Sequence, residues 1–306
     1  MSQTTQLSRV VLVGNQKGGV LKSSIVAAVA AMIARPTRRV LVVDADPQGN
    51  VSRNDLGVPG DRGQGLAMAI QYGQPINPIQ NVRDGLDVIP GGPLLSSIGA
   101  LAVTAASSGV DLGGNLVRTL AELCGGKQYT LVLIDSAPGD AALLEILLGT
   151  SRYLLVPTAD DSASLDGVKL LAGRYLRARQ QGAQIELLGV VLANVNPRAT
   201  ARNAAALATI AEMLGGSGAD PFDAIIRTDK AAAVDMRLRN LTPAELVAAA
   251  EGNVRSRIAH LRKGTRADTD LWSRDASGLA GDYQGLTREI LQRIALREAA
   301  ALELAK

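Results

Sequence analysis

The chain of 306 residues is poor in the side chains on which several kinds of chemistry depend. It has one cysteine, Cys124, so a single chain can form neither a disulfide nor a cysteine-based metal cluster. Its one histidine, His260, lies in a basic segment with neither a metal-binding set nor a Ser/His/Asp arrangement around it. We therefore interpret His260 as a surface residue and not as a catalyst.

Aromatic residues make up only 2% of the sequence, with one phenylalanine, Phe222, and one tryptophan, Trp272. The core must then be built from Ala, Val, Leu and Ile, which suits helices laid over a parallel sheet. Binding of single-stranded nucleic acid is disfavoured, because it relies on aromatic side chains that stack on bases. Trp272 stands in a polar stretch, where we expect it to anchor the C-terminal tail by packing.

Long apolar runs are also missing. Without an apolar run of about 18 residues or a signal-like N-terminus, we expect a soluble, cytoplasmic protein that has no contact with membranes. The composition, 47% hydrophobic and 20% charged, argues against global disorder. A formal charge of +3 and a pI near 9.1 permit contact with nucleic acid, but the excess is small, so the placement of the charges must decide.

Short apolar runs alternate with helical patterns along most of the chain. The predicted strands cover residues 9–13, 40–43, 86–89, 131–134, 153–156 and 187–192, and the predicted helices include 24–34, 115–123, 164–180 and 202–214. This alternation predicts βαβ units and hence an α/β fold with a mostly parallel, doubly wound sheet covered on both faces. Ligands of such sheets bind at the carboxyl ends of the strands.

The pattern becomes helical after Phe222. Thr242-Pro243-Ala244-Glu245 is typical of a helix start, with an N-cap, a proline in the first turn and an acidic residue. A polar stretch over 264–281 separates this helix from a last one at about 286–304. We expect one α/β domain over residues 1–250 and a helical C-terminal extension over 251–306 that packs on the domain or continues it.

The segment from Gly14 to Ser23 lies between the first strand and the first helix, which is where a phosphate-binding loop occurs. Its backbone N–H groups and the helix N-terminus can cradle phosphate, Lys22 can neutralise the β and γ phosphates, and Ser23 can hold Mg²⁺. The alternative is a glycine-rich turn that serves only tight packing. The expected nucleotide contacts run through Lys17, Gly18, Gly19, Val20, Leu21, Lys22, Ser23 and Ser24.

Two carboxylate-bearing segments support a nucleotide site. Asp44 and Asp46 follow the second strand, and Asp135 ends the apolar run 131–134 in the manner of a Walker B acid. Either segment alone has a plain alternative as a helix cap or turn former. All three loops in this order predict a Mg²⁺-nucleotide site instead.

The run Asn15-Gln16-Lys17-Gly18-Gly19-Val20, followed by Asp44-Ala45-Asp46-Pro47-Gln48-Gly49-Asn50, resembles the ParA branch of the deviant Walker A ATPases. Weaker similarity continues through Ile134-Asp135-Ser136-Ala137-Pro138, Val156-Pro157, Ser164-Leu165-Asp166-Gly167 and Gly189-Val190-Val191, and the resemblance covers about residues 9–250. It implies a P-loop NTPase fold, ATP and Mg²⁺ as cofactors, and ATP hydrolysis.

The resemblance also implies a role for individual residues. Lys17, the signature lysine, would reach the partner's phosphates in a nucleotide-sandwich homodimer, and Asp46 would position the attacking water. Ser23, Asp44 and Asp135 would act on Mg²⁺, partly through water. Asn194, in the loop after the strand 187–192, would contact adenine.

Leu21 departs from the family pattern, which has glycine before the Walker lysine. A non-glycine residue forced into a left-handed conformation costs roughly 1–2 kcal/mol, which predicts slow turnover. The alternative is a shifted loop that keeps Leu21 at negative φ. If Leu21 prevented turnover, the protein would be a nucleotide-dependent scaffold.

The resemblance implies nonspecific binding of double-stranded DNA and a ParB-like adaptor that stimulates hydrolysis, as expected for a nucleoid-associated partition ATPase. A solvated helix face is the plain alternative for the basic residues, since Asp268 and Asp270 follow closely. A MinD-like membrane ATPase is the competing function, but the last helix is rich in alanine and acids and lacks aromatic anchors. The candidate DNA contacts are Arg227, Lys230, Arg255, Arg257, Arg262, Lys263 and Arg266.

Overall fold

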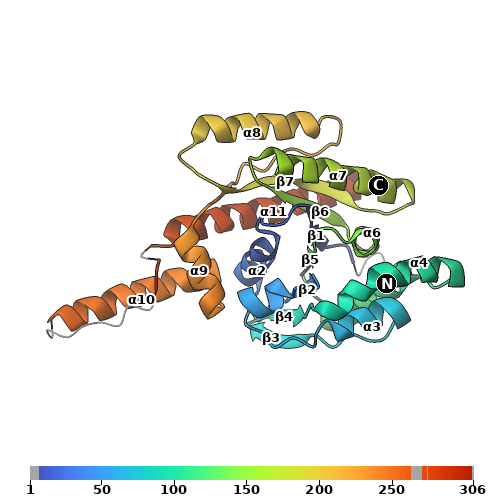
Figure 1. Ribbon diagram of the computed structural model, residues 1–306, viewed down its shortest axis with the longest axis horizontal. Helices are drawn as coiled ribbons and strands as arrows, with labels where there is room; N and C mark the ends of the chain where they lie inside the picture. The colour runs from blue at the N-terminus through green and yellow to red at the C-terminus, as the bar shows by residue number, and fades with distance from the viewer. Residues whose placement is uncertain (1–6, 263–270, 274, 305–306) are drawn as a thin grey trace.

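The computed structural model describes residues 7–262, 271–273 and 275–304 and contains an eight-stranded sheet (Figure 1). The spatial order of the strands is β3-β4-β2-β5-β1-β6-β7-β8, and all neighbours are parallel except β3 and β4. The predicted mostly parallel α/β sheet is thus confirmed. The strands are β1 (Val10–Val13), β2 (Val40–Ala45), β3 (Ile79–Arg83), β4 (Leu86–Ile89), β5 (Leu131–Ser136), β6 (Tyr153–Thr158), β7 (Glu186–Val195) and β8 (Ile226–Arg227).

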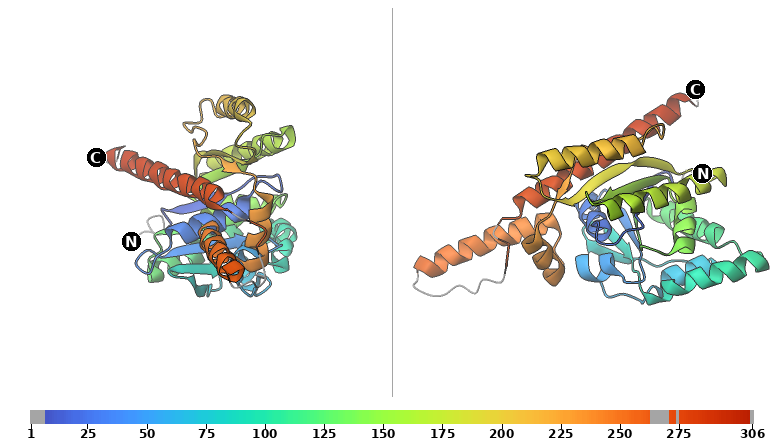
Figure 2. Two further views of the ribbon diagram at one scale, coloured as in Figure 1. Left: turned by 90° about the vertical axis from the view of Figure 1, so that its left-hand side faces the viewer. Right: turned by 45° about the horizontal axis from the view of Figure 1, so that its top comes forward.

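Helices cover both faces of the sheet (Figures 1 and 2). On one face lie α3 (Gln64–Tyr72), α4 (Ile98–Ser108), α5 (Leu112–Lys127), α6 (Ala141–Thr150), α7 (Ser162–Gln180) and α8 (Thr200–Met213). On the other lie α2 (Lys22–Ile33), α9 (Lys230–Arg239) and α11 (Ser277–Leu304), and α10 (Pro243–Arg262) packs against α9 and α11. Two short turns complete the chain, the π-helical turn η1 (Val51–Asp55) and the 3₁₀ turn η2 (Pro93–Ser97).

The strand sequences explain why two cores form. In β1, Val10 and Leu12 belong to the core under α3–α8, while Val11 and Val13 belong to the core under α2, α9 and α11. Because successive side chains of a strand point to opposite faces, a strand covered on both sides must be apolar at every position. The carboxyl ends of β1, β2 and β5 meet at one edge of the sheet, which places the predicted loops together.

The edge hairpin of β3 and β4 was not predicted in full. Only β4 appears in the sequence as an apolar run, since β3 carries exposed Gln80 and Asn81. Gly85, at φ 77°, makes the turn, where a Cβ would lie 2.0 Å from the carbonyl oxygen of Arg35. An edge strand with one solvated face has no continuous apolar signal, which explains the omission.

Helices α3, α4 and α6 were also absent from the prediction, and α11 begins at Ser277, inside the stretch predicted to be polar linker. Trp272 corrects another expectation, because the residue is 74% exposed and not buried in the core. The buried carboxylate of Asp235 holds this segment instead, accepting hydrogen bonds from the N–H groups of Trp272 (3.1 Å) and Ser273 (2.6 Å). Packing therefore does not anchor the tail at Trp272.

The C-terminal part combines a packed helix with a projecting one. Leu286, Ile290 and Ile294 of α11 are buried in the core with α2, whereas α10 extends away from the body (Figures 1 and 2). Thr242 and Glu245 form the expected cap at the start of α10, the N–H of Thr242 donating to Glu245 Oε2 at 2.7 Å. Because α10 crosses residue 250, the division into 1–250 and 251–306 stays a prediction. No helix in the described ranges is both long and apolar enough to span a membrane.

Two buried ionisable side chains lie outside the group of loops that follow β1, β2 and β5. Cys124 of α5 is buried, and burial raises the pKa of its thiol to about 12. Asp55, at the end of η1, is 7% exposed, and burial raises the pKa of its carboxyl to about 7, against the opposing effect of Arg237. An ionised Asp55 is therefore costly in the folded protein.

We predict that Asp55→Asn stabilises the protein at pH 8 and has a much smaller effect at pH 4. Since the folded pKa lies above the unfolded one, the stability that Asp55 contributes is complete below pH 4 and is lost as the pH rises through about 7. Urea unfolding should show a gain of roughly 2–4 kcal/mol at pH 8. The exposed Asp223→Asn variant is the control, and equal effects of Asp55→Asn at both pH values would contradict the assignment.

Candidate active site

The loop between β1 and α2 is fixed by hydrogen bonds to the end of β6. The N–H of Gly14 donates to the carbonyl of Leu155 at 3.0 Å, and Asn15 Nδ2 donates to the carbonyl of Pro157 at 2.7 Å. Asn15 Oδ1 accepts from the N–H of Lys17 at 2.9 Å, so the buried amide of Asn15 shapes the loop. Beyond it, Lys17, Gly18 and Gly19 are exposed.

The sequence left open whether Leu21 is left-handed or is kept at negative φ by a shifted loop. The structure shows Leu21 in the strained, left-handed conformation. Its φ of 63° and ψ of 22° are left-handed, and its carbonyl accepts the first hydrogen bond of α2, from Ile25 at 2.9 Å. That conformation costs about 1–2 kcal/mol for a residue with a Cβ. The half-buried Leu21 side chain packs against the core that contains Met236 and Leu279, and this contact offsets the strain.

Two buried carboxylates lie side by side where β2 and β5 end. Asp44 and Asp135 occupy paired positions of the two strands, and both are 0% exposed. Asp135 Oδ2 accepts from the hydroxyl of Ser23 at 2.7 Å, while its Oδ1 has no hydrogen-bond partner among the described residues. Asp44 is held by Ser52, whose N–H and hydroxyl donate to Oδ2 at 2.9 and 2.6 Å.

Asp46 lies two residues farther along the same loop and is 5% exposed. Its Oδ1 accepts from the N–H of Gln48 at 2.8 Å. Gly91, in the loop after β4, lies directly on this segment, since a Cβ there would be 2.6 Å from the carbonyl oxygens of both Asp44 and Asp46. The absence of a side chain at Gly91 therefore sets the position of the Asp44–Asp46 segment.

The buried charges at the carboxyl ends of β2 and β5 shift one another's pKa values. Burial raises the pKa of Asp135 well above its usual value, and the neighbouring Asp44 raises it further. Burial likewise raises the pKa of Asp44 to about 6 and lowers the pKa of Lys22, which Asp135 and Asp46 oppose. Lys22 is 6% exposed and donates from Nζ to the carbonyl of Lys17 at 2.9 Å. The site thus holds more negative than positive charge, and a cation would relieve this.

The donor set fits Mg²⁺ bound together with phosphate. No group of three or more His, Cys, Asp or Glu side chains within the described ranges is arranged to hold a metal by itself. Mg²⁺ needs no such group, because it commonly takes one or two protein oxygens and fills its shell with phosphate and water. The Ser23 hydroxyl and the unpartnered Oδ1 of Asp135 are oxygen ligands of this kind.

A small pocket of about 90 Å³ opens beside Leu21 and Ser24. Asn194, at φ 60°, lies on its wall with Thr228, whose hydroxyl donates to Asn194 Oδ1 at 3.0 Å. Leu279 and Tyr283 of α11 also line it, so the C-terminal helix contributes to this wall. The structure thereby places the candidate adenine residue next to the loop.

The candidate DNA contacts separate into different environments. Arg227 is held by Asp282 of α11, its Nε and Nη2 donating at 2.6 and 2.8 Å, so its guanidinium is engaged within the chain. Lys230, Arg255 and Arg262 are exposed, and Arg255 also pairs with Glu251 at 3.4 Å. The side chain of Arg257 and the residues Lys263 and Arg266 lie outside the described part of the chain.

Three residues of the site received no role from the sequence. Gln16 carries a buried Nε2 without a partner among the described residues, Gly91 packs on the Asp44–Asp46 segment, and Gly167 of α7 packs on the loop. A Cβ at Gly167 would lie 2.4 Å from Asn15 Oδ1 and 3.2 Å from the Lys17 Cβ. Close approach between segments distant in sequence leaves no local signal, so the packing role of these two glycines is visible only in the structure.

Comparison with known proteins agrees with this geometry. Residues 8–186, more than half of the chain, match a family model described as the AAA domain. The chromosome-partitioning ATPase Soj of Thermus thermophilus is 32% identical over 185 residues, which cover 60% of this chain and 68% of Soj. The chain belongs to the ParA family of P-loop ATPases. As a ParA-family member it is an ATP hydrolase whose cofactors are ATP and Mg²⁺.

Solved structures extend the likeness to nearly the whole chain. A Cyanothece McdA–ATP complex superposes with a TM-score of 0.67 at 16% identity, covering 93% of this chain and 96% of McdA. The pNOB8 ParA bound to nonspecific DNA gives a TM-score of 0.60 at 20% identity, covering 94% of this chain and 98% of that one. At these identities the likeness is one of fold.

We predict that Leu21→Gly is more stable than Leu21→Ala by about 1–2 kcal/mol, because both variants lose the side chain but only alanine keeps the left-handed strain. Urea unfolding of the two variants measures the difference. Ala163, exposed at the start of α7, offers the control Ala163→Gly, which should be destabilised as an ordinary helical residue is. Equal stabilities of the two Leu21 variants would show that the loop relaxes to negative φ.

Proposed function

We propose that this protein is a DNA-partition ATPase whose ATP-bound form is a sandwich dimer that binds DNA without sequence preference. Hydrolysis, stimulated by a ParB-like adaptor, would reset the dimer to monomers. The observation that carries the proposal is the different placement of the two lysines of the loop. Lys22 is buried beside Asp135, whereas Lys17 is exposed at the surface of the same loop.

The two lysines suit two different phosphate contacts. Lys22 is buried near Asp135 and Asp46. Because it lies inside its own loop, it can contact only a nucleotide that is bound by the same chain. The exposed Lys17 is available to a nucleotide in a second protomer. A contact that exists only in the dimer makes ATP favour the dimer, which is the differential affinity that a switch requires.

The remaining residues divide the work of phosphoryl transfer. Ser23, Asp44 and Asp135 would act on Mg²⁺, partly through water, and Asp46 would orient the attacking water. Bound Mg²⁺ supplies charge neutralisation at the β and γ phosphates. Asn194 would contact the adenine from the pocket wall. Hydrolysis needs these groups at fixed positions, and the contacts of Asn15, Gly91 and Ser52 provide that fixation.

The strain at Leu21 favours a slow enzyme. Leu21 holds a side chain at positive φ and packs on the core to which α9 and α11 contribute, so motion of the loop on binding ATP would act against both constraints. The loop is thereby tied to the C-terminal helices. We infer that turnover without the adaptor is slow while nucleotide binding persists.

The projecting helix α10 supports the DNA part of the proposal. Arg255 and Arg262 lie on its exposed distal half, and Lys230 begins α9 near the pocket. Arg227 takes a structural part instead, since Asp282 holds its guanidinium. Binding to chromosomal DNA in this way would place the protein on the nucleoid.

We predict that Lys17→Ala remains monomeric with ATP and Mg²⁺, whereas the unaltered protein dimerises. Light scattering after size exclusion measures this, and the control is Lys169→Ala, which removes an exposed lysine in the middle of α7. The Lys17→Ala protein should still bind ATP, because Lys22 is unchanged. A dimer that forms without ATP, or one that Lys17→Ala leaves intact, would refute the mechanism.

We predict that Lys230→Ala, Arg255→Ala and Arg262→Ala each weaken DNA binding for all sequences alike. Each lost phosphate contact lowers the slope of log K against log salt by about 0.9. Anisotropy titrations of a random 30-base-pair duplex, with ATP and at several salt concentrations, measure the slope. Arg118→Ala on α5 is the control on the opposite face of the sheet. Unchanged slopes in all three variants would remove α9 and α10 from the DNA surface.

A further inference from the structure

Helix α7 meets the nucleotide loop at a glycine. Gly167 is buried, and a Cβ there would lie 2.4 Å from Asn15 Oδ1 and 3.2 Å from both the backbone nitrogen and the Cβ of Lys17. Its φ is not positive, so the backbone conformation does not call for glycine. Glycine inside a helix is ordinarily unfavourable compared with alanine. What position 167 requires is therefore space for the loop.

The backbone of Lys17 is held by Asn15, which is held in turn by β6. Asn15 is 2% exposed, and its amide accepts from the N–H of Lys17 at 2.9 Å and donates to the carbonyl of Pro157 at 2.7 Å. Helix α7, which carries Gly167, follows β6 directly in the chain. Both supports of Lys17, the amide of Asn15 and the backbone of Gly167, thus depend on the segment formed by β6 and α7.

The side chain of Lys17 lies near the start of the same helix. Asp161 caps α7 by accepting from the N–H and the hydroxyl of Ser164 at 3.0 and 2.6 Å. The bond from the Ser164 hydroxyl is the main cause that lowers the pKa of the Asp161 carboxyl, and the positive charge of Lys17 lowers it further against the effect of burial. An ammonium that acts on Asp161 in this way stands on the α7 side of the loop.

Lys22 is supported from the other side of the loop. Strand β1 lies between β5 and β6 in the sheet. Lys17 depends on β6 and α7, whereas Lys22 is the first residue of α2 and lies near Asp135 of β5 and Asp46 after β2. The bond from Lys22 Nζ to the Lys17 carbonyl, at 2.9 Å, joins the two, and a phosphate that takes Nζ would remove this link. The two lysines of the loop are therefore positioned by different parts of the sheet.

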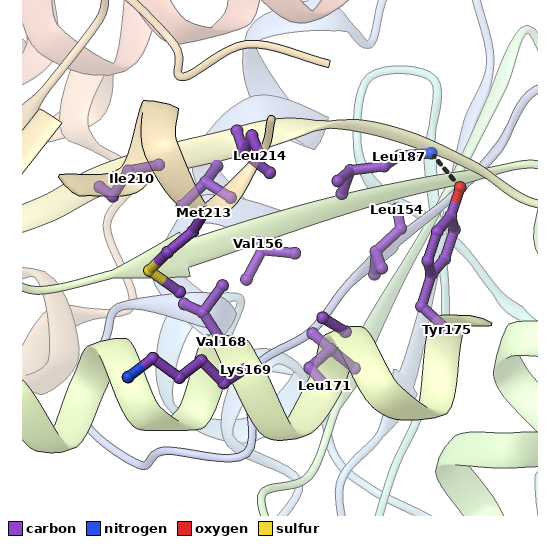
Figure 3. Close-up of a pocket in the computed structure, with 12 residues that line it drawn as sticks. Leu154, Val156, Val168, Lys169, Leu171, Tyr175, Leu187, Ile210, Met213 and Leu214 are labelled. Carbon is purple, nitrogen blue, oxygen red and sulfur yellow. Dashed lines mark hydrogen bonds between the residues drawn. The ribbon is translucent and has the colours of Figure 1, made fainter. Parts of the chain in front are cut away.

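A side chain at position 167 displaces either the helix or the loop. Helix α7 is fastened to the sheet, because Val168 and Leu171 are buried and the hydroxyl of Tyr175 accepts from the N–H of Leu187 on β7 at 3.2 Å (Figure 3). The tip of the loop, by contrast, is exposed. We therefore expect the loop to give way.

We infer that Asn15 and Gly167 are positioning residues for Lys17, and that β6 and α7 set the place of Lys17 independently of Lys22. The inference rests on the proposed function in one respect, because there Lys17 contacts phosphate in the ATP-bound dimer. A methyl group at position 167 pushes Asn15 Oδ1 away from the N–H of Lys17, while the surroundings of Lys22 stay as they are. Binding of ATP and the action of Lys17 thereby become separable.

Two variants of the full chain test this separation, Gly167→Ala, which adds the methyl group, and Asn15→Ala, which removes the amide. Each should bind a fluorescent ATP analogue with Mg²⁺ within about three-fold of the unaltered affinity, yet hydrolyse saturating ATP about ten-fold more slowly or worse, since a misplacement of about 1 Å can cost 100-fold. Gly173→Ala is the matched control on α7, because Gly173 is exposed and a Cβ there meets nothing within 4 Å. The control should change neither quantity.

Backbone and methyl NMR of the nucleotide-free protein measure the displacement itself. The amide resonances of Gly18 and Gly19 at the tip of the loop should shift in both variants and stay in place in Gly173→Ala. Val168 and Leu171 line a cavity of about 160 Å³ between α7 and α8, which offers the helix room to move (Figure 3). Shifts confined to these two side chains, with an unmoved loop tip, would overturn the inference.

The rates and affinities decide the remaining outcomes. An unaltered rate in Gly167→Ala contradicts the positioning, and a loss of ATP affinity together with the rate contradicts the independence of the two lysines. An equal loss in Gly173→Ala would show an effect of the whole helix and would also count against the inference. Should Gly167→Ala fail to fold, Asn15→Ala decides by the same measurements.

The variant Lys17→Ala separates a failure of this inference from a failure of the proposed function. If Lys17→Ala hydrolyses ATP at the unaltered rate, the proposed role of Lys17 falls, and the resonances of the loop tip still decide whether Asn15 and Gly167 position it. If Lys17→Ala is slow and Gly167→Ala is not, the positioning inference alone falls.

Discussion

The structure depends on a charge imbalance at the carboxyl ends of two neighbouring strands. Asp44 and Asp135 are fully buried in paired positions, with Asp46 close by and one lysine, Lys22, among them. Two like charges 4 Å apart repel by about 4 kcal/mol at the effective dielectric near a protein surface, and by more in a drier interior. Burial is the main cause of the raised pKa values of Asp44 and Asp135, and repulsion from neighbouring carboxylates raises both further. A divalent cation turns the same arrangement into an attractive one.

The nucleotide loop is supported from both faces of the sheet. On one face Gly167 of α7 packs on Asn15 and Lys17, and on the other Leu21 packs into the core formed by α9 and α11. The loop is thus the point where the two layers of helices meet. The small pocket that Leu21 shares with Asn194 and Tyr283 consequently borders this loop.

Much of this arrangement follows from the sequence because its causes are local. Strands buried on both faces give continuous apolar runs, as in β1 and in residues 131–134 of β5, and the loop from Gly14 to Ser23 falls between a strand and a helix as its chemistry requires. The sequence shows that Leu21 replaces a glycine of the family pattern, but it does not determine whether φ at Leu21 is positive or negative. The hairpin strand β3 and the start of α11 at Ser277 escaped prediction, because one is a half-solvated edge and the other begins in a polar stretch. The packing of Gly91 and Gly167 depends on distant segments and has no local pattern.

The single buried cysteine has a practical consequence. Cys124 is 6% exposed and its thiol has a pKa of about 12, so almost no thiolate is present at neutral pH to attack an alkylating reagent. A cysteine introduced at an exposed position, such as Ser256 on the projecting α10, would react alone with a maleimide dye. The protein therefore accepts one fluorophore at a chosen place without first removing its native thiol, which opens its assembly to fluorescence resonance energy transfer.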